Sequence, residues 1–506
     1  MRVAALLAAA LAGTANDGWI DRHIEFRLEG VTPSPLCDEP EFLRRVSLDL
    51  AGVVPTMSEA RAYLARPDRR KLVDRLLESD EFSARWARFL LELTAESRAI
   101  SFGNQDFNGH AYYGWLVRQI HERRPYDRIV RDIIGAKGGY EEAPEVQFLI
   151  RWRVIGLGDL TSHLGKAILG TRLRCAQCHD HPYQRISQED FWGVAAFFTR
   201  TREYANTDDG LPGITEVKQP FKIRLPSQEL PKEGAPPPEP VAIEPRWLGA
   251  SGPASGAGRA ELAKSLAADP LFAKNIVNRL WAELMGRGLQ EPLDGFGGKT
   301  KPSHPRLLDE LAGHFIQSGY DLRATLRLIA MSKAYQRSCR SDGMEPALFA
   351  HAALRPLSVD QLYLSLNRAT VVQEPSAPRL DAGSGKANAK EMMMADRNAA
   401  SSADALYADR WPRQLLGDVP GASTAGRLAM FNRREIQKLI DAGVHAALKA
   451  MGPNVGEDHF EYITLALLSR PLSKSERKRV EGKKDTADLR DFFWAAVNSI
   501  EFRYNH

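Results

Sequence analysis

The sequence predicts a mainly α-helical protein, with two helical domains joined by a linker rich in proline and glycine that holds a few short β-strands. Apolar residues recur at helical spacing through most of the chain, and capping signals start several of these segments. One long stretch has too much Pro and Gly to form a helix. With 506 residues, 43% of them hydrophobic and 26% charged, the chain has the composition of an ordinary globular protein with more than one folding unit.

Residues 1–15 are expected to form a short secretory signal peptide, with a plain N-terminal helix as the alternative. One arginine precedes an apolar run, which ends in the small residues Gly13, Thr14 and Ala15. No later stretch reaches the roughly 18 uninterrupted apolar residues that a membrane span needs. The mature chain is therefore expected in the periplasm or otherwise outside the cytoplasm, without a membrane span.

The first helical domain is predicted over residues 16–204. The segment "SDEFSARWARFLLELTAESR" is predicted to be one of its helices, because its apolar residues recur at three- and four-residue spacing and form a single stripe. Thr56 with Glu59 three residues later is a capping box that predicts the start of another helix. The stripe consists of Phe82, Trp86, Phe89, Leu90 and Leu93.

Residues 205–258 form the predicted linker, with short strands expected around "PFKIRL" and "EPVAIEP". A second helical domain follows over residues 259–506. Its predicted signals are a helix end at Gly286, a helix start at Ser303, and capping boxes at Ser358 with Gln361 and at Ser473 with Glu476. Residues 374–402 lack any period and are predicted to be an exposed insertion, in which Met392, Met393 and Met394 are more typical of a surface segment than of a metal site.

Several function classes find no support in the sequence. The net charge of +4 is small for this length, so a nucleic-acid partner is not expected. The chain has no Gly-x-Ser-x-Gly elbow, no His-Glu-x-x-His and no phosphate-binding Gly-rich loop. Whether the protein is an enzyme therefore stays open.

The segment "CAQCHDHP" carries the strongest chemical signal. Cys175, Cys178 and His179 have the Cys-x-x-Cys-His spacing of haem c attachment. Two thiols one helical turn apart can each form a thioether with a porphyrin vinyl group, and the adjacent imidazole can become the axial iron ligand. The first hypothesis is therefore an exported protein with one covalent haem, working in electron transfer or another redox role.

Two other interpretations of this segment stay open. Cys175, Cys178, His179 and His181 are four potential zinc ligands, although so close a spacing is crowded for a tetrahedron. A disulfide between Cys175 and Cys178 is the metal-free possibility. Either one would make the chain an extracytoplasmic binding or scaffold protein.

The surroundings of a haem are less well defined. His181 is too close to His179 to reach the opposite face of the ring, so a hydrogen bond that supports the site is expected, with Pro182 fixing the turn and Asp180 orienting an imidazole. Arg172 and Arg174 could pair with haem propionates or be ordinary surface arginines. The candidates for a distal ligand are His163, His110, His121 or a methionine.

Longer stretches resemble a known family. "FLRRVSLDLAGVVPT" and "LGTRLRCAQCHDHPYQRISQEDFWGVAAFF" resemble the planctomycete-type cytochrome-like PSCyt domain. "NIVNRLWAELMGRGLQEPLDGFG", "PSHPRLLDELAGHF" and the final "NSIEFRYNH" resemble the PSD domain of unknown function that usually follows it. The resemblance implies a secreted bacterial protein. Because genes of this family commonly neighbour those for sulfatase-like secreted proteins, it also implies a secreted sulfatase-like protein as partner, and an accessory role in sulfatase-linked polysaccharide degradation as an alternative function. The haem hypothesis implies a redox partner instead.

In the stretches that resemble the PSD domain, five polar residues form a second candidate site, which would line a substrate cleft or contact the haem domain. They are Asn278, Arg279, Arg287, Asp294 and His304. Helix caps and an ion pair that holds the loop are the structural alternative. For the two remaining cysteines, Cys37 and Cys339, a disulfide between the domains and free thiols both stay open.

Overall fold

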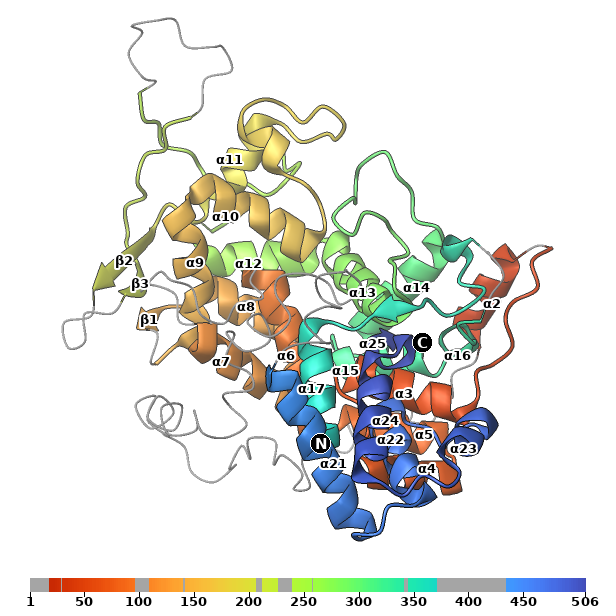
Figure 1. The fold of residues 1–506 in the computed structure, drawn as a ribbon. Helices are drawn as coiled ribbons and strands as arrows, with labels where there is room; N and C mark the ends of the chain where they lie inside the picture. The colour runs from red at the N-terminus through yellow and green to blue at the C-terminus, as the bar shows by residue number, and fades with distance from the viewer. Residues whose placement is uncertain are drawn as a thin grey trace, which may run out of the picture.

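The computed structural model describes residues 18–28, 30–95, 109–139, 142–205, 212–225, 239–256, 258–340, 345–370 and 434–506. Helices predominate in these residues and strands are few and short (Figure 1), which confirms the mainly α fold class. None of the described helices is both long and apolar enough to cross a membrane. The predicted signal peptide and the three methionines 392–394 lie outside the described residues.

The first half of the chain is a series of short helices, and both of its predicted helix signals are confirmed. Thr56 and Glu59 form the capping box of α4, and α6 buries the whole predicted apolar stripe. The helices are α2 (Trp19–Arg27), α3 (Glu39–Leu50), α4 (Met57–Ala65), α5 (Arg69–Leu77), α6 (Asp80–Ala95), α7 (Gly109–His121), α8 (Tyr126–Gly135), α9 (Gln147–Ile155), α10 (Leu157–Leu164) and α11 (Gln188–Ala196), with a π-helical turn at Gly165–Leu169 and 3-10 helices at Pro144–Val146 and Arg174–Gln177.

The second half is also helical. Its helices are α12 (Arg259–Ala268), α13 (Pro270–Met285), α14 (Pro305–Gln317), α15 (Leu322–Ala330), α16 (Lys333–Gln336), α17 (Val359–Thr370), α21 (Arg434–Met451), α22 (Glu457–Leu468), α23 (Lys474–Val480), α24 (Thr486–Asn498) and α25 (Ile500–Arg503), with a 3-10 helix at Pro346–Leu348.

Most of the predicted helix ends in this half are confirmed. Gly286 ends α13 in the left-handed conformation, with φ of 82°, and the capping boxes at Ser358 and Ser473 form. The predicted cap at Ser303 is wrong by one residue, because His304 is the N-cap of α14. The Ser303 hydroxyl instead donates to the carbonyl oxygen of Leu289 at 3.1 Å.

The strands of the described residues form two small antiparallel sheets. In the first, β3 (Pro212–Glu216) lies between β1 (Gly138–Gly139) and β2 (Thr201–Ala205). In the second, β4 (Arg355–Pro356) pairs with β5 (Tyr504–Asn505). The strands expected around residues 220–225 and 239–245 form only a single bridge, between Ile223 and Val241.

The main hydrophobic core runs through both halves of the chain. Trp86 in α6 and Trp281 in α13 are fully buried members of the same apolar cluster. The buried Arg259 at the start of α12 donates to the carbonyl oxygens of Ile134 and Ala136, at 3.0 and 2.7 Å. The predicted linker therefore joins two halves that share one core.

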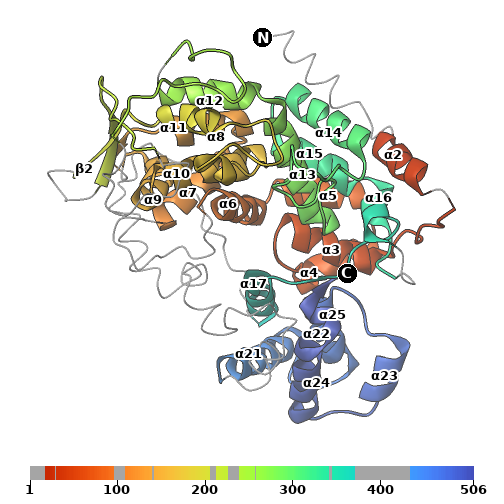
Figure 2. The same cartoon turned by 90° about the horizontal axis from the view of Figure 1, so that it is seen from above.

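A second apolar cluster holds the C-terminal helices. It is built from α17, α21, α22 and α24 and includes Leu48 of α3 together with Val54. Figure 2 shows these helices as a group on one side of the molecule, next to α3 and α4. The C-terminal helices are thereby packed against the beginning of the chain.

Candidate functional site

The cysteine motif lies in a loop between the π-helical turn and α11, here called the motif loop (residues 170–187). A single 3-10 turn, Arg174–Gln177, shapes its first part. Residues three apart share a face of such a turn. Leu173 and Ala176 point inward into a small apolar cluster, whereas the side chains of Cys175 and Cys178 are exposed. Both sulfurs therefore lie on the solvent side, and both are free thiols.

His179 is exposed, and its ring orientation is set by a local hydrogen bond. Its Nδ1 lies 2.7 Å from the backbone carbonyl oxygen of Asp180. A carbonyl oxygen can only accept, so Nδ1 carries the proton, and in the neutral ring Nε2 carries the lone pair. Nε2 is thus the atom of His179 that is available to an iron or another metal.

His181 organises the loop. Its Nδ1 accepts hydrogen bonds from the backbone N–H groups of Tyr183 and Gln184, at 3.2 and 3.1 Å. Burial lowers the pKa of His181, although a hydrogen bond to the backbone of Arg172 opposes this. With Nδ1 used as an acceptor, the neutral ring carries its proton on Nε2. His181 therefore supports the turn and does not offer a lone pair to a metal.

Replacing His181 with Ala is expected to speed amide hydrogen exchange at Tyr183 and Gln184 by about fivefold, because each amide loses an acceptor worth about 1 kcal/mol. Hydrogen exchange resolved by NMR measures this. The Ala176 amide, which donates to the carbonyl oxygen of Leu173 at 2.9 Å, is the internal control and should not change. Unchanged exchange at Tyr183 and Gln184 would rule out this role of His181.

The start of α11 holds the backbone of the motif. The Asp180 carboxylate accepts from the backbone N–H of Gln188 at 2.9 Å and so caps α11. Asp180 orients an imidazole, that of His179, through its backbone carbonyl oxygen and not through this carboxylate. The Gln188 amide donates to the carbonyl oxygens of Gln177 and Cys178, both at 3.2 Å, and the Trp192 indole donates to that of Gln177 at 3.0 Å. Sequence reasoning missed Gln188 and Trp192. The capping box at Ser187 and Asp190 would have placed the helix start beside the motif.

The two arginines before the motif pair with carboxylates. Arg172 lies 2.7 Å from Asp294 and Arg174 lies 3.0 Å from Asp159. Both guanidinium groups are well exposed. Of the two possibilities for these residues, the geometry favours ordinary surface arginines with protein partners.

Two of the candidate distal ligands, His163 and His121, have contacts within the described residues. His163 is buried, stacks on Trp152 with ring centroids 3.8 Å apart, and has Nε2 at 2.6 Å from the carbonyl oxygen of Thr94. His121 lies 3.4 Å from Asp80 at the surface. The side chain of His110 lies outside the described residues. His163 and His121 are thus engaged in contacts with other parts of the fold.

A loop of the second half, residues 286–301, packs against the motif loop. The carbonyl oxygen of Phe296 accepts from the Thr171 hydroxyl at 3.0 Å and from the Gln184 amide at 3.2 Å. The Phe296 N–H donates to the carbonyl oxygen of Gly170 at 3.0 Å. Lys299 places its ammonium 4.2 Å from the ring centroid of the exposed Tyr183. On the side of residues 286–301 these contacts use the backbone of Phe296 and the ammonium of Lys299, so no side-chain pattern in the sequence predicts them.

Four of the five polar residues predicted in the second half contact different partners. Asn278 is buried and holds the 286–301 loop through two hydrogen bonds with Gln290, at 3.0 and 2.9 Å. Arg279 donates to the carbonyl oxygen of Lys166 at 2.9 Å, and Asp294 binds Arg172, so both reach the first half of the chain. Arg287 is half-buried at the start of the loop, and His304 caps α14. Asp294 is the member of the set that contacts the motif loop.

His304 makes the fold sensitive to acid. Its side chain packs against Phe349, with ring centroids 5.5 Å apart. Burial, together with the charges of Arg27 and His23, lowers the pKa of His304 to about 4. The unfolded chain keeps the ordinary histidine pKa of about 6.5. The contribution of the neutral ring is complete above about pH 6.5 and is lost as the pH falls toward about 4, a total of about 3 kcal/mol.

The expected result is that acid destabilises the wild-type protein more than the variant His304→Gln, which has no group to titrate there. The difference between their free energies of unfolding should change by about 3 kcal/mol between pH 7 and pH 4. Urea denaturation at a series of pH values measures it. Parallel pH profiles of the two proteins would contradict this account of His304.

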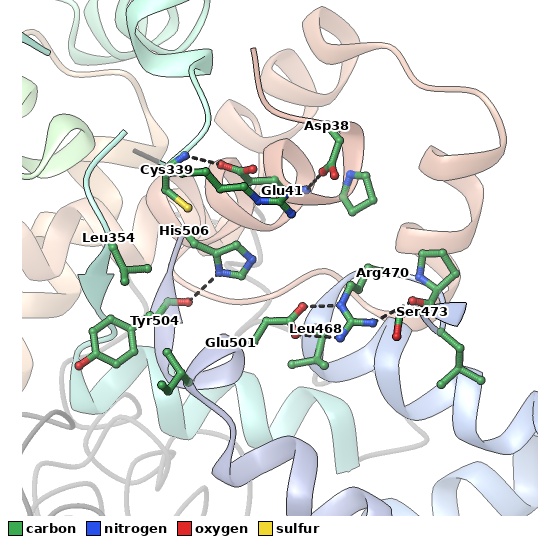
Figure 3. A pocket seen from close by; sticks show the side chains of 15 residues that line it. Asp38, Glu41, Cys339, Leu354, Leu468, Arg470, Ser473, Glu501, Tyr504 and His506 are labelled. Carbon is green, nitrogen blue, oxygen red and sulfur yellow. Dashed lines mark hydrogen bonds and ion pairs between the residues drawn. The ribbon is translucent and has the colours of Figure 1, made fainter. Parts of the chain in front are cut away.

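A pocket of about 610 Å³ lies between α3 and the C-terminal helices. Figure 3 shows Cys339, Glu41 and His506 facing Arg470 and Glu501 across it. The Glu41 carboxylate accepts from the backbone N–H of Cys339 at 2.9 Å, and Arg470 is already paired with Glu501 and Glu476. The pocket holds none of the residues of the two candidate sites.

Cys37 and Cys339 are both free thiols in the structure. Cys37 is buried and Cys339 is half-buried. Burial raises the pKa of both thiols. Of the two possibilities for this pair of cysteines, the structure has the free thiols.

The motif loop presents two exposed thiols three residues apart and an imidazole whose Nε2 bears a lone pair, which are the donor types that covalent haem attachment uses. Within the described ranges no group of three or more His, Cys, Asp and Glu side chains is arranged to hold a metal ion. A second pocket, of about 520 Å³, lies beside α11 and is lined partly by Trp192, Ile243 and Arg246. Neither pocket is lined by Cys175, Cys178 or His179.

Comparison with protein families matches two parts of the chain, in the order in which the motifs occur. Residues 19–203 match PSCyt2, described as a protein of unknown function (DUF1549), and residues 258–400 match PSD1, described as a protein of unknown function (DUF1553). No curated protein and no solved structure matches the chain. The motif loop lies inside the PSCyt2 match and the 286–301 loop inside the PSD1 match. The chain is therefore similar to PSCyt2 in its first part and to PSD1 in its second, two domains whose function is unknown.

Proposed function

We propose that this chain is an exported c-type-haem-like protein that works in electron transfer, with haem attached to Cys175 and Cys178 and with His179 as the axial ligand. The observation that carries the proposal is the arrangement of the three side chains. Cys175 lies in the 3-10 turn Arg174–Gln177, Cys178 directly follows that turn, and both thiols are exposed. The adjacent imidazole of His179 has its Nδ1–H bound to the Asp180 carbonyl oxygen. A bound haem would supply an iron that changes oxidation state by one electron.

The chain's own residues would prepare this site before any group is attached. The side chains of Gln188 and Trp192 in α11 donate hydrogen bonds to the carbonyl oxygens of Gln177 and Cys178. These hydrogen bonds fix the backbone that bears the two thiols. The Asp180 carbonyl oxygen orients the ring of His179. His181 fixes the turn that follows, which gives the residues beyond a minimal Cys-x-x-Cys-His motif a structural purpose.

Two features of the surroundings bear on this function. The motif is open to solvent, and the described pockets do not enclose it. An exposed redox site is suited to exchange of electrons with a partner protein that docks on it. We place this partner, together with the protein itself, outside the cytoplasm, because the first residues are typical of a signal peptide.

A second candidate function is supported by the exposure of both thiols. Cys175 and Cys178 could form a disulfide with each other by thiol–disulfide exchange with a partner protein. The two thiols would lose two electrons and two protons, and these would reduce a disulfide of the partner to two thiols. A zinc-stabilised scaffold has less support, because His181 offers no lone pair and no metal-binding group is found among the described residues.

The haem proposal is tested by a pyridine haemochrome spectrum of protein made together with a periplasmic haem-attachment system. The expected result is a covalent haem spectrum with near-stoichiometric haem, and no haem in the variant Cys175→Ser/Cys178→Ser. Wild-type protein without haem, in which the two cysteines form a disulfide reversibly, would favour the second candidate and overturn the first.

A further inference from the structure

Three exposed basic side chains lie on the two loops that meet at the cysteine motif. Arg185 belongs to the motif loop, and Lys299 and Lys301 belong to the 286–301 loop. None of the three forms an ion pair with another residue of the described ranges. These three residues are here called the basic surface, and their charges are available to a partner.

A cation–π contact joins the two loops at the surface. The ammonium of Lys299 lies 4.2 Å from the ring centroid of Tyr183, and Tyr183 is 64% exposed. One residue further along the motif loop, the Gln184 amide donates to the carbonyl oxygen of Phe296 at 3.2 Å. Lys299 is therefore held beside the motif loop, with an exposed aromatic ring under its charge.

The backbone on both sides of this contact is fixed. Arg185 lies in a turn that is closed by a hydrogen bond of 2.8 Å from the N–H of His181 to the carbonyl oxygen of Ile186. In the 286–301 loop, the hydroxyl of Thr300, which lies between the two lysines, accepts from the Gln290 amide at 2.8 Å. The basic surface thus projects from two segments that the fold holds in place.

The acidic residues of the same two loops are engaged within the fold. Asp180 and Glu291 accept hydrogen bonds from backbone N–H groups, at 2.9 and 2.6 Å, and Asp294 pairs with Arg172 at 2.7 Å. The two loops hold six basic and three acidic residues, so their net charge is +3, whereas that of the whole chain is +4. The excess positive charge beside the motif is therefore nearly as large as that of the entire protein.

The basic surface is an open face. Neither described pocket is lined by its residues or by Tyr183. Small ligands bind in clefts that bury most of their surface, whereas complementary charge on open faces steers two proteins together. The exposed thiols of Cys175 and Cys178 lie in the same motif loop. This geometry favours the face of another protein as the partner of the surface.

We propose that the basic surface docks the acidic face of a redox partner protein, with carboxylates of the partner paired with its three cations and with Tyr183 in contact between them. Both halves of the chain then contribute to docking, because the lysines belong to the PSD1 match and the motif loop to the PSCyt2 match. The inference rests on the proposed function, since it names the chemistry of the partner that exchanges electrons with this motif.

Binding of poly-L-glutamate, which carries the carboxylates of an acidic protein face, tests the proposal on the full chain without haem. Fluorescence anisotropy of the labelled peptide gives the dissociation constant, and hydrogen exchange measured by mass spectrometry locates the bound peptide. An ionic strength of about 0.1 M is used, because charges more than about 10 Å apart are then largely screened. We expect slower exchange in residues 170–187 and 286–301.

The variant Arg185→Gln/Lys299→Gln/Lys301→Gln is expected to bind the peptide about tenfold more weakly, because three unpaired cations are lost. A matched variant removes the same charge from another surface. Lys478→Gln/Arg479→Gln/Lys484→Gln changes exposed residues in and directly after α23, which Figures 1 and 2 show well away from α11. It should weaken binding by less than about twofold.

Equal weakening by the two triple variants, or slower exchange elsewhere than in the two loops, would overturn the inference. Binding of dextran sulfate without binding of poly-L-glutamate would also overturn it and would indicate a sulfated polysaccharide as ligand. Circular dichroism should show that both variants fold, since surface substitutions change stability little. The measurement needs no haem, so a failure of haem attachment leaves its result intact, and a failed binding test leaves haem attachment intact.

Discussion

Replacing Asp49 with Ala is expected to lower the free energy of unfolding by about 3 to 5 kcal/mol, because it leaves a largely buried arginine without its counter-charge. Asp49 is 3% exposed and accepts two hydrogen bonds from Arg355, at 2.7 and 2.9 Å. It also accepts from the Tyr335 hydroxyl at 2.8 Å and from the Asn505 amide at 2.7 Å. One carboxylate thus joins α3 to three later segments of the chain.

Urea denaturation measures this effect, and the chain offers a control of the same chemistry at the surface. Asp441 pairs with Arg490 at 2.6 Å, but its side chain is 58% exposed. Asp441→Ala should therefore cost less than about 1 kcal/mol. Equal losses of stability in Asp49→Ala and Asp441→Ala would show that the buried network does not hold the ends of the chain together.

The single variants His179→Ala and His181→Ala are expected to have very different effects on the haem-loaded protein. His179→Ala removes the proposed axial ligand, so the reduction potential should shift by on the order of 0.1 V. His181→Ala removes only the acceptor of two backbone hydrogen bonds, so the absorption spectrum and potential should stay close to those of the wild type.

Spectroelectrochemical titration of the wild type and both variants measures the potentials, and the absorption spectrum reports the iron ligands. The assignment of His179 would be wrong if His179→Ala left the potential and the spectrum unchanged. A larger shift of the reduction potential in His181→Ala than in His179→Ala would indicate that His181, and not His179, is the axial ligand.

The helices were largely predictable because their signals are local. The capping box of Thr56 with Glu59 and the apolar stripe of α6 involve neighbours on one helix, and both form. The cap at Ser303 failed because a distant carbonyl group, that of Leu289, takes its hydroxyl. The sheet of β1, β2 and β3 was missed for the same reason, since it pairs Gly138–Gly139 with residues far along the sequence.

The sequence predicted which side chains form the candidate site, but not which other residues hold them in place. The spacing of Cys175, Cys178 and His179 identified the exposed side chains. Periodicity tells which residues are buried but not what they are buried against. The shared core of the two halves, and the contact of Phe296 and Lys299 with the motif loop, therefore came only from the structure.

Covalent attachment of a haem to the motif loop can be read from the intact mass of the protein. The protein is made with a haem-attachment system and denatured, so that any group held without a bond is lost. We expect a mass increase of one haem in the wild type and none in Cys175→Ser/Cys178→Ser. A wild-type protein with the mass of its polypeptide alone, and with both thiols still open to alkylation, would contradict it.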